Sequence, residues 1–331
     1  MLEDSSLQLL QNKKNLLAFS AGVDSTALLF LLLENHISFD IAIVDYGVRV
    51  QSKEEIAYAK ELAQTYNFTC HTLQAPKIDT NFEAKARAIR YNFFKDLIQK
   101  NSYQNLLTAH HLGDKLEWML MQFCKGAGCV ELSGMQEKEQ RKNYTLIRPL
   151  LHVDKEDLLA FLHAKQIHYF EDASNSDEKY RRNIFRQKFA KPLLQEYKEG
   201  IKKSFCYLDE DRASLIEDVH IETINDFAYF KSTKSKRADI FAIDRYIKSK
   251  GTLISAHEKE LLKKEKTVIV GRKFVLNQEH GYVFIAPYKR ANSLPKAFKE
   301  QMRLLHVEPK LRGYLYDDAE TYLQVKRLLT Y

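Results

Sequence analysis

The chain has 331 residues, of which 45% are hydrophobic and 29% are charged. These fractions are typical of globular proteins, and no stretch reaches the roughly 20 consecutive apolar residues that a membrane-spanning helix needs. The N-terminus lacks the basic, apolar and small-residue order of a secretory signal, so we expect a soluble, cytoplasmic protein of two domains with no membrane contact.

The four cysteines, Cys70, Cys124, Cys129 and Cys206, follow neither zinc-site nor Cys-x-x-Cys spacing. A chain of this size also needs no disulfides to hold its core together. We therefore expect reduced, non-catalytic thiols.

Basic residues are concentrated in the second half of the chain. Residues 1–180 hold 20 basic and 24 acidic side chains, whereas residues 181–331 hold 31 basic and 20 acidic ones. A cationic half joined to a near-neutral half indicates a polyanionic partner such as a nucleic acid. A basic surface that only aids solubility is the alternative.

Strand-like apolar runs alternate with helix-like segments in the first half. The strands are expected at 15–19, 39–45, 69–74 and 105–110, and helices between them at 52–67 and 82–100. This alternation predicts an α/β fold with a parallel sheet. Ligands of such a sheet bind at the carboxyl ends of its strands, where the turns at 20–25, 45–49 and 109–114 are expected to gather.

The pattern changes after residue 150. A helix is expected from Asp154, a polar loop follows at 168–177, and long basic helices follow from 180 to 219; strand-like runs return near 267. We therefore expect a catalytic domain over 1–200 and a smaller basic region over 201–331, helical to 262 and α+β from 263.

The turn "SAGVDS", Ser20–Ser25, joins the first strand to a helix. Amides at such a helix start attract an anion. The turn lacks the lysine of a Walker motif and the glycine spacing of a dinucleotide site. Asp24 would repel a phosphate unless a divalent cation lay between them, so the turn indicates Mg²⁺-bound nucleotide. An ordinary capped helix start is the alternative.

A second candidate group lies in "TAHHLGDKLEWMLMQFCKGAGCVELSGM", residues 108–135. His110, Asp114 and Glu117 are spaced i, i+4 and i+7 and share one helical face. A histidine and two carboxylates at a sheet edge can orient an amine and move protons. A helix cap with surface acids would give the same spacing.

The turn "SAGVDS" resembles the Ser-Gly-Gly-x-Asp-Ser loop of the ATP pyrophosphatase superfamily, which implies that Ser20, Ala21, Gly22, Val23, Asp24 and Ser25 bind ATP. Ala21 stands where that loop has glycine. A methyl group is tolerated there if the φ angle of residue 21 is negative.

Six further segments resemble the tRNA(Ile)-lysidine synthetase family in their order along the chain. They are "VDYGVRVQSKEE", "EAKARAIRY", "TAHHLGDKLEWM" with "LSGM", "IRPLL", "EDASNSDEKYRRNIFR" and "AFKEQMRLLHVEPKLRGYLYDD". The chain departs from the family at Tyr46, Gly113, Lys115 and Trp118, where histidine, aspartate, glutamine and threonine are usual.

The resemblance implies an ATP-dependent ligase that adenylates a cytidine in the CAU anticodon of a tRNA(Ile) and joins L-lysine to it. It assigns catalysis to Asp24, His110, Asp114, Glu117, Arg87, Arg90 and Arg182, with Arg186 a weaker candidate, Mg²⁺ to Asp24, and tRNA contacts to Lys310 and Arg312. A homodimer is one possible assembly. A tRNA thiolation enzyme and a non-catalytic nucleotide- or RNA-binding protein are the alternatives.

Overall fold

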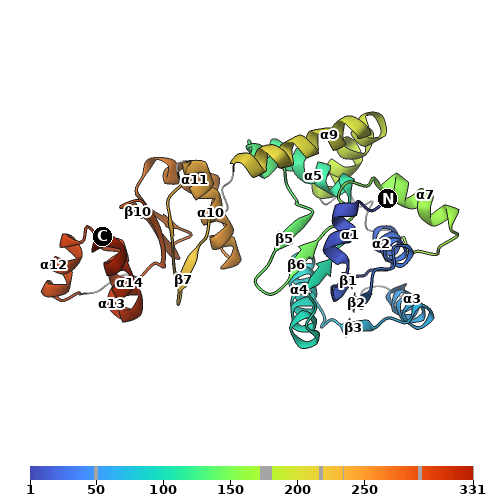
Figure 1. Ribbon diagram of the computed structural model, residues 1–331, viewed down its shortest axis with the longest axis horizontal. Coiled ribbons are helices and arrows are strands. Elements are labelled where there is room, and N and C mark those ends of the chain that lie inside the picture. The colour runs from blue at the N-terminus through green and yellow to red at the C-terminus, as the bar shows by residue number, and fades with distance from the viewer. Residues whose placement is uncertain (48–50, 172–180, 216–218, 234, 290–292, 331) are drawn as a thin grey trace. The chain divides into compact units, whose positions relative to one another are not determined.

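The computed structural model describes every residue except 48–50, 172–180, 216–218, 234, 290–292 and 331. The chain divides into two compact units, Met1–Arg212 and Ala213–Tyr331. Each unit has its own sheet and its own apolar core (Figure 1).

The first unit is built on a six-stranded sheet in the order β3-β2-β1-β4-β6-β5. All neighbouring strands are parallel except β5, which is antiparallel to β6. The strands are β1 (Asn15–Ala18), β2 (Phe39–Asp45), β3 (Cys70–Gln74), β4 (Asn105–Leu107), β5 (Lys138–Gln140) and β6 (Thr145–Ile147). The predicted α/β class with a parallel sheet is confirmed.

The helical elements of the first unit are α1 (Asp4–Leu10), α2 (Val23–Glu34), α3 (Gln51–Tyr66), α4 (Phe82–Asn101), α5 (Leu112–Phe123), α6 (Cys129–Leu132), α7 (Lys155–Ala164), α8 (Arg181–Phe185), a π-helical turn (Arg186–Ala190) and α9 (Lys191–Leu215). Helix α4 packs on one face of the sheet, and α2 and α7 pack on the other. Leu16 packs into the core beneath α4, whereas its neighbour Leu17 packs with α2 and α7. Side chains alternate across a strand, so β1 must be apolar at both positions.

Strand β1 is the point where the strand order reverses. It pairs with β2 on one side and with β4 on the other, in parallel with both. The turns that follow β1 and β4 therefore leave the sheet at the same edge and side by side. In a doubly wound sheet this edge is where a ligand binds.

Helices α5 and α9 run side by side (Figure 1). Leu112 and Leu116 of α5 pack against Leu194 and Phe205 of α9. The fully buried Lys115 donates to Asp209 of α9, with 2.7 Å between Nζ and Oδ2, and its ammonium lies 4.7 Å from the centroid of the Phe205 ring. Lys115, a departure from the family pattern, therefore holds α5 to α9.

The second unit is a five-stranded antiparallel sheet in the order β7-β8-β11-β10-β9, with helices on both faces. Its elements are β7 (Glu222–Ile224), β8 (Phe227–Lys231), α10 (Lys236–Ser249), α11 (Ala256–Lys264), β9 (Thr267–Val270), β10 (Phe274–Glu279), β11 (Tyr282–Pro287), α12 (Lys296–Leu304), α13 (Pro309–Asp317) and α14 (Ala319–Thr330). Ala228 and Phe230 face α10 and α11, and Phe227 and Tyr229 face the three C-terminal helices.

The two compact units divide at 212/213, close to the boundary expected near residue 200, and both positions lie inside α9. One expectation for the second half needs correction. The expectation that 201–262 is entirely helical is wrong, because β7 and β8 lie within it. The buried run "FAYF" of β8 is short, and periodicity alone cannot distinguish a short apolar run from a buried helix segment.

The buried ion pair between α5 and α9 gives a stability prediction. Asp209→Ala leaves the Lys115 ammonium buried without its partner, so we expect the free energy of unfolding to fall by about 3 kcal/mol. Urea unfolding followed by Trp118 fluorescence measures it, because this single tryptophan lies on α5.

The matched control removes an exposed ion pair of the same unit. Glu34→Ala breaks its contact with Lys165, where both side chains are more than 40% exposed, and should cost less than about 1 kcal/mol. An Asp209→Ala loss no larger than that of the control would contradict the proposed packing role of Lys115.

Candidate active site

The turn after β1 is closed by its two serines. Ser20 Oγ lies 3.0 Å from Ser25 Oγ, and the Ser20 amide donates to Ser25 Oγ over 3.2 Å. Gly22 is the N-cap of α2, and no side chain caps this helix end. The first-turn amides of α2 therefore lack a capping partner and can bind an external anion such as a phosphate.

Ala21 adopts a left-handed conformation, with φ of +56°. The condition of a negative φ, under which the methyl group was expected to be tolerated, is therefore not met. The residue is fully buried in the apolar core, so its methyl group points away from the solvent side of the turn. The strain of this conformation, about 1 kcal/mol, is a cost to folding and does not block the approach of a ligand.

Asp24 projects from the first turn of α2 toward the turn after β4. Its Oδ1 atom is buried and has no hydrogen-bond partner among the described residues, and Lys155 Nζ lies 3.8 Å from it. Its Oδ2 atom lies 3.9 Å from Nε2 of His111. Mg²⁺ bound to a nucleotide takes one or two carboxylates together with phosphate oxygens, so this under-paired carboxylate fits such an ion.

His111 connects the two helix starts. Its Nδ1 accepts the Gly113 amide over 3.0 Å, and its own amide donates to Asp114 Oδ2 over 3.1 Å, which completes a capping box for α5. In the neutral ring the proton is therefore on Nε2, which lies between Asp24 and Asp114. A Cβ atom on Gly113 would come within 2.8 Å of the His111 ring, so glycine at this departure from the family pattern leaves room for the imidazole.

Two buried carboxylates on α5 are bound by two arginines. Arg182 and Arg186 each donate through Nη2 to Asp114 Oδ1 over 3.1 Å. Glu117, which is 1% exposed, accepts from Nε of Arg186 over 3.0 Å and from Nε of Arg182. Burial alone opposes ionisation of Asp114, but the surrounding histidines and arginines outweigh it and hold the pKa of Asp114 well below its usual range. Asp114 can therefore stay charged in a buried site.

His110 lies beside this cluster as a neutral base. Its Nδ1 is 2.9 Å from Thr108 Oγ1. Burial lowers the pKa of His110 to about 4; the Asp114 carboxylate opposes this shift and nearby arginines add to it. At neutral pH the imidazole is therefore uncharged and able to accept a proton.

The two arginines predicted on α4 differ in their surroundings. Arg87 is exposed, lies with its guanidinium 4.7 Å from the centroid of the Tyr91 ring, and is near enough to His110 to lower the pKa of that imidazole. Arg90 instead lies near Tyr46, where it opposes the rise that burial causes in the pKa of the tyrosine. Only Arg87 is thus linked to the histidine and carboxylate cluster.

Lys310 and Arg312 belong to the second unit. Lys310 is exposed. Arg312 donates through Nε and Nη2 to the Val307 carbonyl, over 2.9 and 2.8 Å, and so binds the loop between α12 and α13. Arg312 therefore has a structural contact that its predicted role did not include.

The structure adds three residues to the predicted site: His111, Lys155 and Arg148. Arg148 follows β6 and contributes to the lowered pKa of His110. The second histidine of "TAHH" and the lysine directly after the N-cap Asp154 are sequence signals that could have indicated the first two. For Arg148, the sequence contains no indication of a site residue apart from its place in the segment "IRPLL".

Two further features concern the thiols and the helices. All four cysteines are free, and Cys124 and Cys206 are exposed. In the part of the chain that the structure describes, every helix is too short or too polar to span a bilayer.

Residues 2–193 match the PP-loop domain family. A tRNA(Ile)-lysidine synthase of Campylobacter jejuni is 42% identical, covering 96% of each chain, and one of Wolinella succinogenes is 45% identical, covering 93% of this chain and 94% of the relative. Among solved structures, a U34-tRNA thiolase, NcsA, from Methanococcus maripaludis has a TM-score of 0.51 at 18% identity, covering 63% of this chain and 75% of that one. This last similarity indicates the fold alone.

The lowered pKa of His110 makes stability depend on pH. Between about pH 4 and the ordinary histidine pKa of about 6.5 the unfolded chain binds a proton that the folded chain does not. We expect His110 to contribute about 3 kcal/mol of stability above pH 6.5 that is lost as the pH falls toward 4.

Urea unfolding at several pH values between 7 and 4.5 checks this expectation. His110→Gln should flatten the decline, and His163→Gln, which changes an exposed histidine of α7, should leave it in place. An unchanged decline in the His110→Gln variant would contradict the assignment.

Proposed function

The chain belongs to the tRNA(Ile)-lysidine synthase family, and we propose that it joins L-lysine to C2 of the wobble cytidine in a tRNA(Ile) with a CAU anticodon. The reaction converts ATP to AMP and pyrophosphate and changes the codon read from AUG to AUA. One observation supports the proposal most strongly. The start of α2, which has no side-chain cap, and the buried carboxylates of Asp114 and Glu117 lie at the same edge of the sheet.

The first step activates a poor leaving group. The C2 oxygen of cytosine attacks the α-phosphorus of ATP, a bond forms between them, and pyrophosphate leaves with the electron pair of the broken P–O bond. The amides of the turn at 20–25 bind the departing phosphates, because they have the polarity and position that an anion needs. Mg²⁺ held by Asp24 supplies neutralising charge to these phosphates when it is bound.

The second step requires an uncharged amine. The lysine ε-amine attacks C2, the C2–N bond forms, and AMP leaves with the former C2 oxygen. Free lysine has a pKa of about 10.4, so its ammonium must lose a proton before it can attack. We assign proton acceptance to His110, because its imidazole lies near Asp114 and is uncharged at neutral pH.

Asp114 and Glu117 are the residues we assign to the lysine ammonium. Both are buried, and the pKa of Asp114 is depressed, so at least this carboxylate is negative over the whole physiological range. Their present partners are Arg182 and Arg186. Lysine binding therefore involves exchange or sharing of these guanidinium contacts, and a released arginine can bind phosphate or adenylate.

We assign tRNA backbone contacts to the second unit. Residues 213–331 contain 22 basic and 15 acidic side chains. Exposed lysines such as Lys310 can neutralise phosphates, which is the main source of affinity for nucleic acids.

The proposal is tested by supplying the purified chain with ATP, labelled lysine and total bacterial tRNA. We expect label in a tRNA with a CAU anticodon, with one AMP and one pyrophosphate formed per lysine. Asp24→Asn should lower the rate by about 100-fold or more, the usual cost of losing an electrostatic contact at the reacting group. Asp96→Asn, an exposed acid of α4, is the control.

Two results would contradict the proposal. One is label incorporated without ATP. The other is ATP- and tRNA-dependent release of AMP that continues without incorporation of lysine, which would indicate a different second substrate.

A second prediction isolates the lysine contact. Glu117→Gln keeps the shape and the hydrogen-bond acceptor but removes a charge, so we expect the KM for lysine to rise by about 10- to 100-fold while the KM for ATP changes little. Pyrophosphate release at varied lysine concentrations measures the effect. Glu61→Gln on the exposed face of α3 is the control, and an unchanged KM for lysine would exclude Glu117 from the amine site.

A further inference from the structure

A second cluster of ligand-type side chains lies in the first unit, apart from the residues assigned above. One carboxylate oxygen each of Glu3 and Glu137 and a ring nitrogen of His152 all lie within 4.8 Å of one another. Glu3 is the N-cap of α1, Glu137 directly precedes β5, and His152 lies in the loop between β6 and α7. The fold thus brings three separate segments to one point.

Among the residues that the structure describes, the two carboxylates of this cluster have no lysine or arginine as a partner. Within the described ranges, no lysine or arginine forms an ion pair with Glu3 or Glu137, and Lys202, which is nearby, pairs with Glu199. Two carboxylates at this separation repel one another unless a positive charge lies between them. A bound cation would remove this repulsion.

Glu137 is also held in a fixed orientation. The hydroxyl of Ser6, which is 1% exposed, donates to Oε1 of Glu137. The Glu137 carbonyl accepts the Arg148 amide over 2.8 Å. A buried hydroxyl that donates to a carboxylate is a common outer support of a metal ligand.

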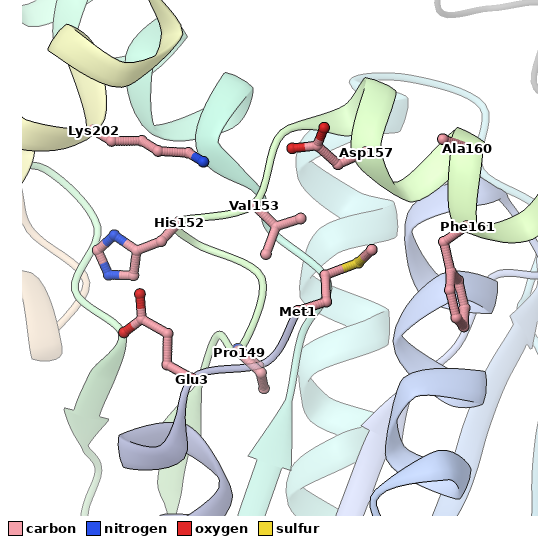
Figure 2. Close-up of a pocket in the computed structure, with 9 residues that line it drawn as sticks. All are labelled: Met1, Glu3, Pro149, His152, Val153, Asp157, Ala160, Phe161 and Lys202. Atoms are coloured by element: carbon pink, nitrogen blue, oxygen red, sulfur yellow. The ribbon is translucent and has the colours of Figure 1, made fainter.

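A cavity of about 640 Å³ opens beside the cluster. Figure 2 shows the carboxylate of Glu3 and the imidazole of His152 pointing toward one another at this cavity, with Met1 and Lys202 also among its lining residues. The cavity leaves room for water to complete the coordination of an ion held by three protein ligands.

We propose that Glu3, Glu137 and His152 form a binding site for a divalent transition-metal ion, of which Zn²⁺ is the best match. One imidazole nitrogen and two carboxylate oxygens suit Zn²⁺ and its neighbours Co²⁺ and Ni²⁺, whereas Mg²⁺ and Ca²⁺ prefer oxygen ligands alone. Zn²⁺ binds these ligands at about 2.0–2.2 Å, so small side-chain rotations bring the three atoms to it. The ion joins the start of α1 to the β5–β6 hairpin and to the loop that leads into α7.

The test uses the full chain freed of metal with EDTA, without ATP or tRNA. Calorimetry with Zn²⁺ should give one equivalent per chain, and Co²⁺ should give visible absorption of a site with nitrogen and oxygen ligands and no thiolate band. His152→Ala should weaken Zn²⁺ binding by 100-fold or more, and Ser6→Ala by about 10-fold, the effect of losing an outer hydrogen bond to a ligand. His163→Ala, at an exposed histidine of α7, is the control.

Two further measurements keep the result unambiguous. Alkylation of the exposed Cys124 and Cys206 should leave the binding intact, because thiols take no part. Glu137→Gln, which keeps the shape of the ligand, should bind Zn²⁺ at least 10-fold more weakly with an unchanged circular dichroism spectrum. Absence of saturable Zn²⁺ binding, or equal binding by the His152→Ala variant, would overturn the proposal. Neither outcome depends on lysine ligation.

Discussion

The site depends on one constraint, the parallel pairing of β1 with β4, which directs two helix starts to the same sheet edge. The two starts differ chemically. Helix α2 begins without a side-chain cap, whereas α5 begins with a complete capping box made by His111 and Asp114. The amides of α2 are therefore available to an external anion, while α5 presents carboxylates to a cation. One sheet edge thus offers an anion site at one helix start and carboxylates at the other.

The carboxylates of α5 can be buried only because they are paired. Each of Asp114 and Glu117 accepts hydrogen bonds from both Arg182 and Arg186, so two negative charges meet two positive ones. An incoming lysine ammonium can take the place of one guanidinium without changing this balance. Arg182 is the easier one to release, because its side chain is 45% exposed and that of Arg186 is 29% exposed. Removing a cation with no replacement would leave a buried charge unpaired, which is strongly unfavourable.

The sequence predicted the first-unit elements that rest on local patterns. The strand expected at 39–45 is β2 with the same bounds, because a strand buried on both faces is a continuous apolar run between turns. Asp114 and Glu117 share one face of α5, as their spacing predicts, but the expectation that His110 shares this helical face is wrong, because His110 precedes the N-cap His111 and lies outside the helix. The arginine contacts to α5 join residues that are 65 to 72 positions apart in the sequence. The spacing of residues within a single helix or strand cannot predict such pairs. Strands β7 and β8 were missed because they lie within a stretch of otherwise helical character.

Three departures from the family pattern, Ala21, Gly113 and Lys115, change the packing behind the site more than the groups that face it. The Ala21 methyl group is in the core, where its burial, about 0.8 kcal/mol per carbon group, offsets part of the left-handed strain. Gly113 gives space to the ring of His111. The ammonium group of Lys115, which a glutamine would lack, forms an ion pair with Asp209 on α9 and not with Asp114. The electrostatic field at the reacting groups is therefore set by the retained carboxylates and their arginines, and the substitutions are compatible with the same chemistry.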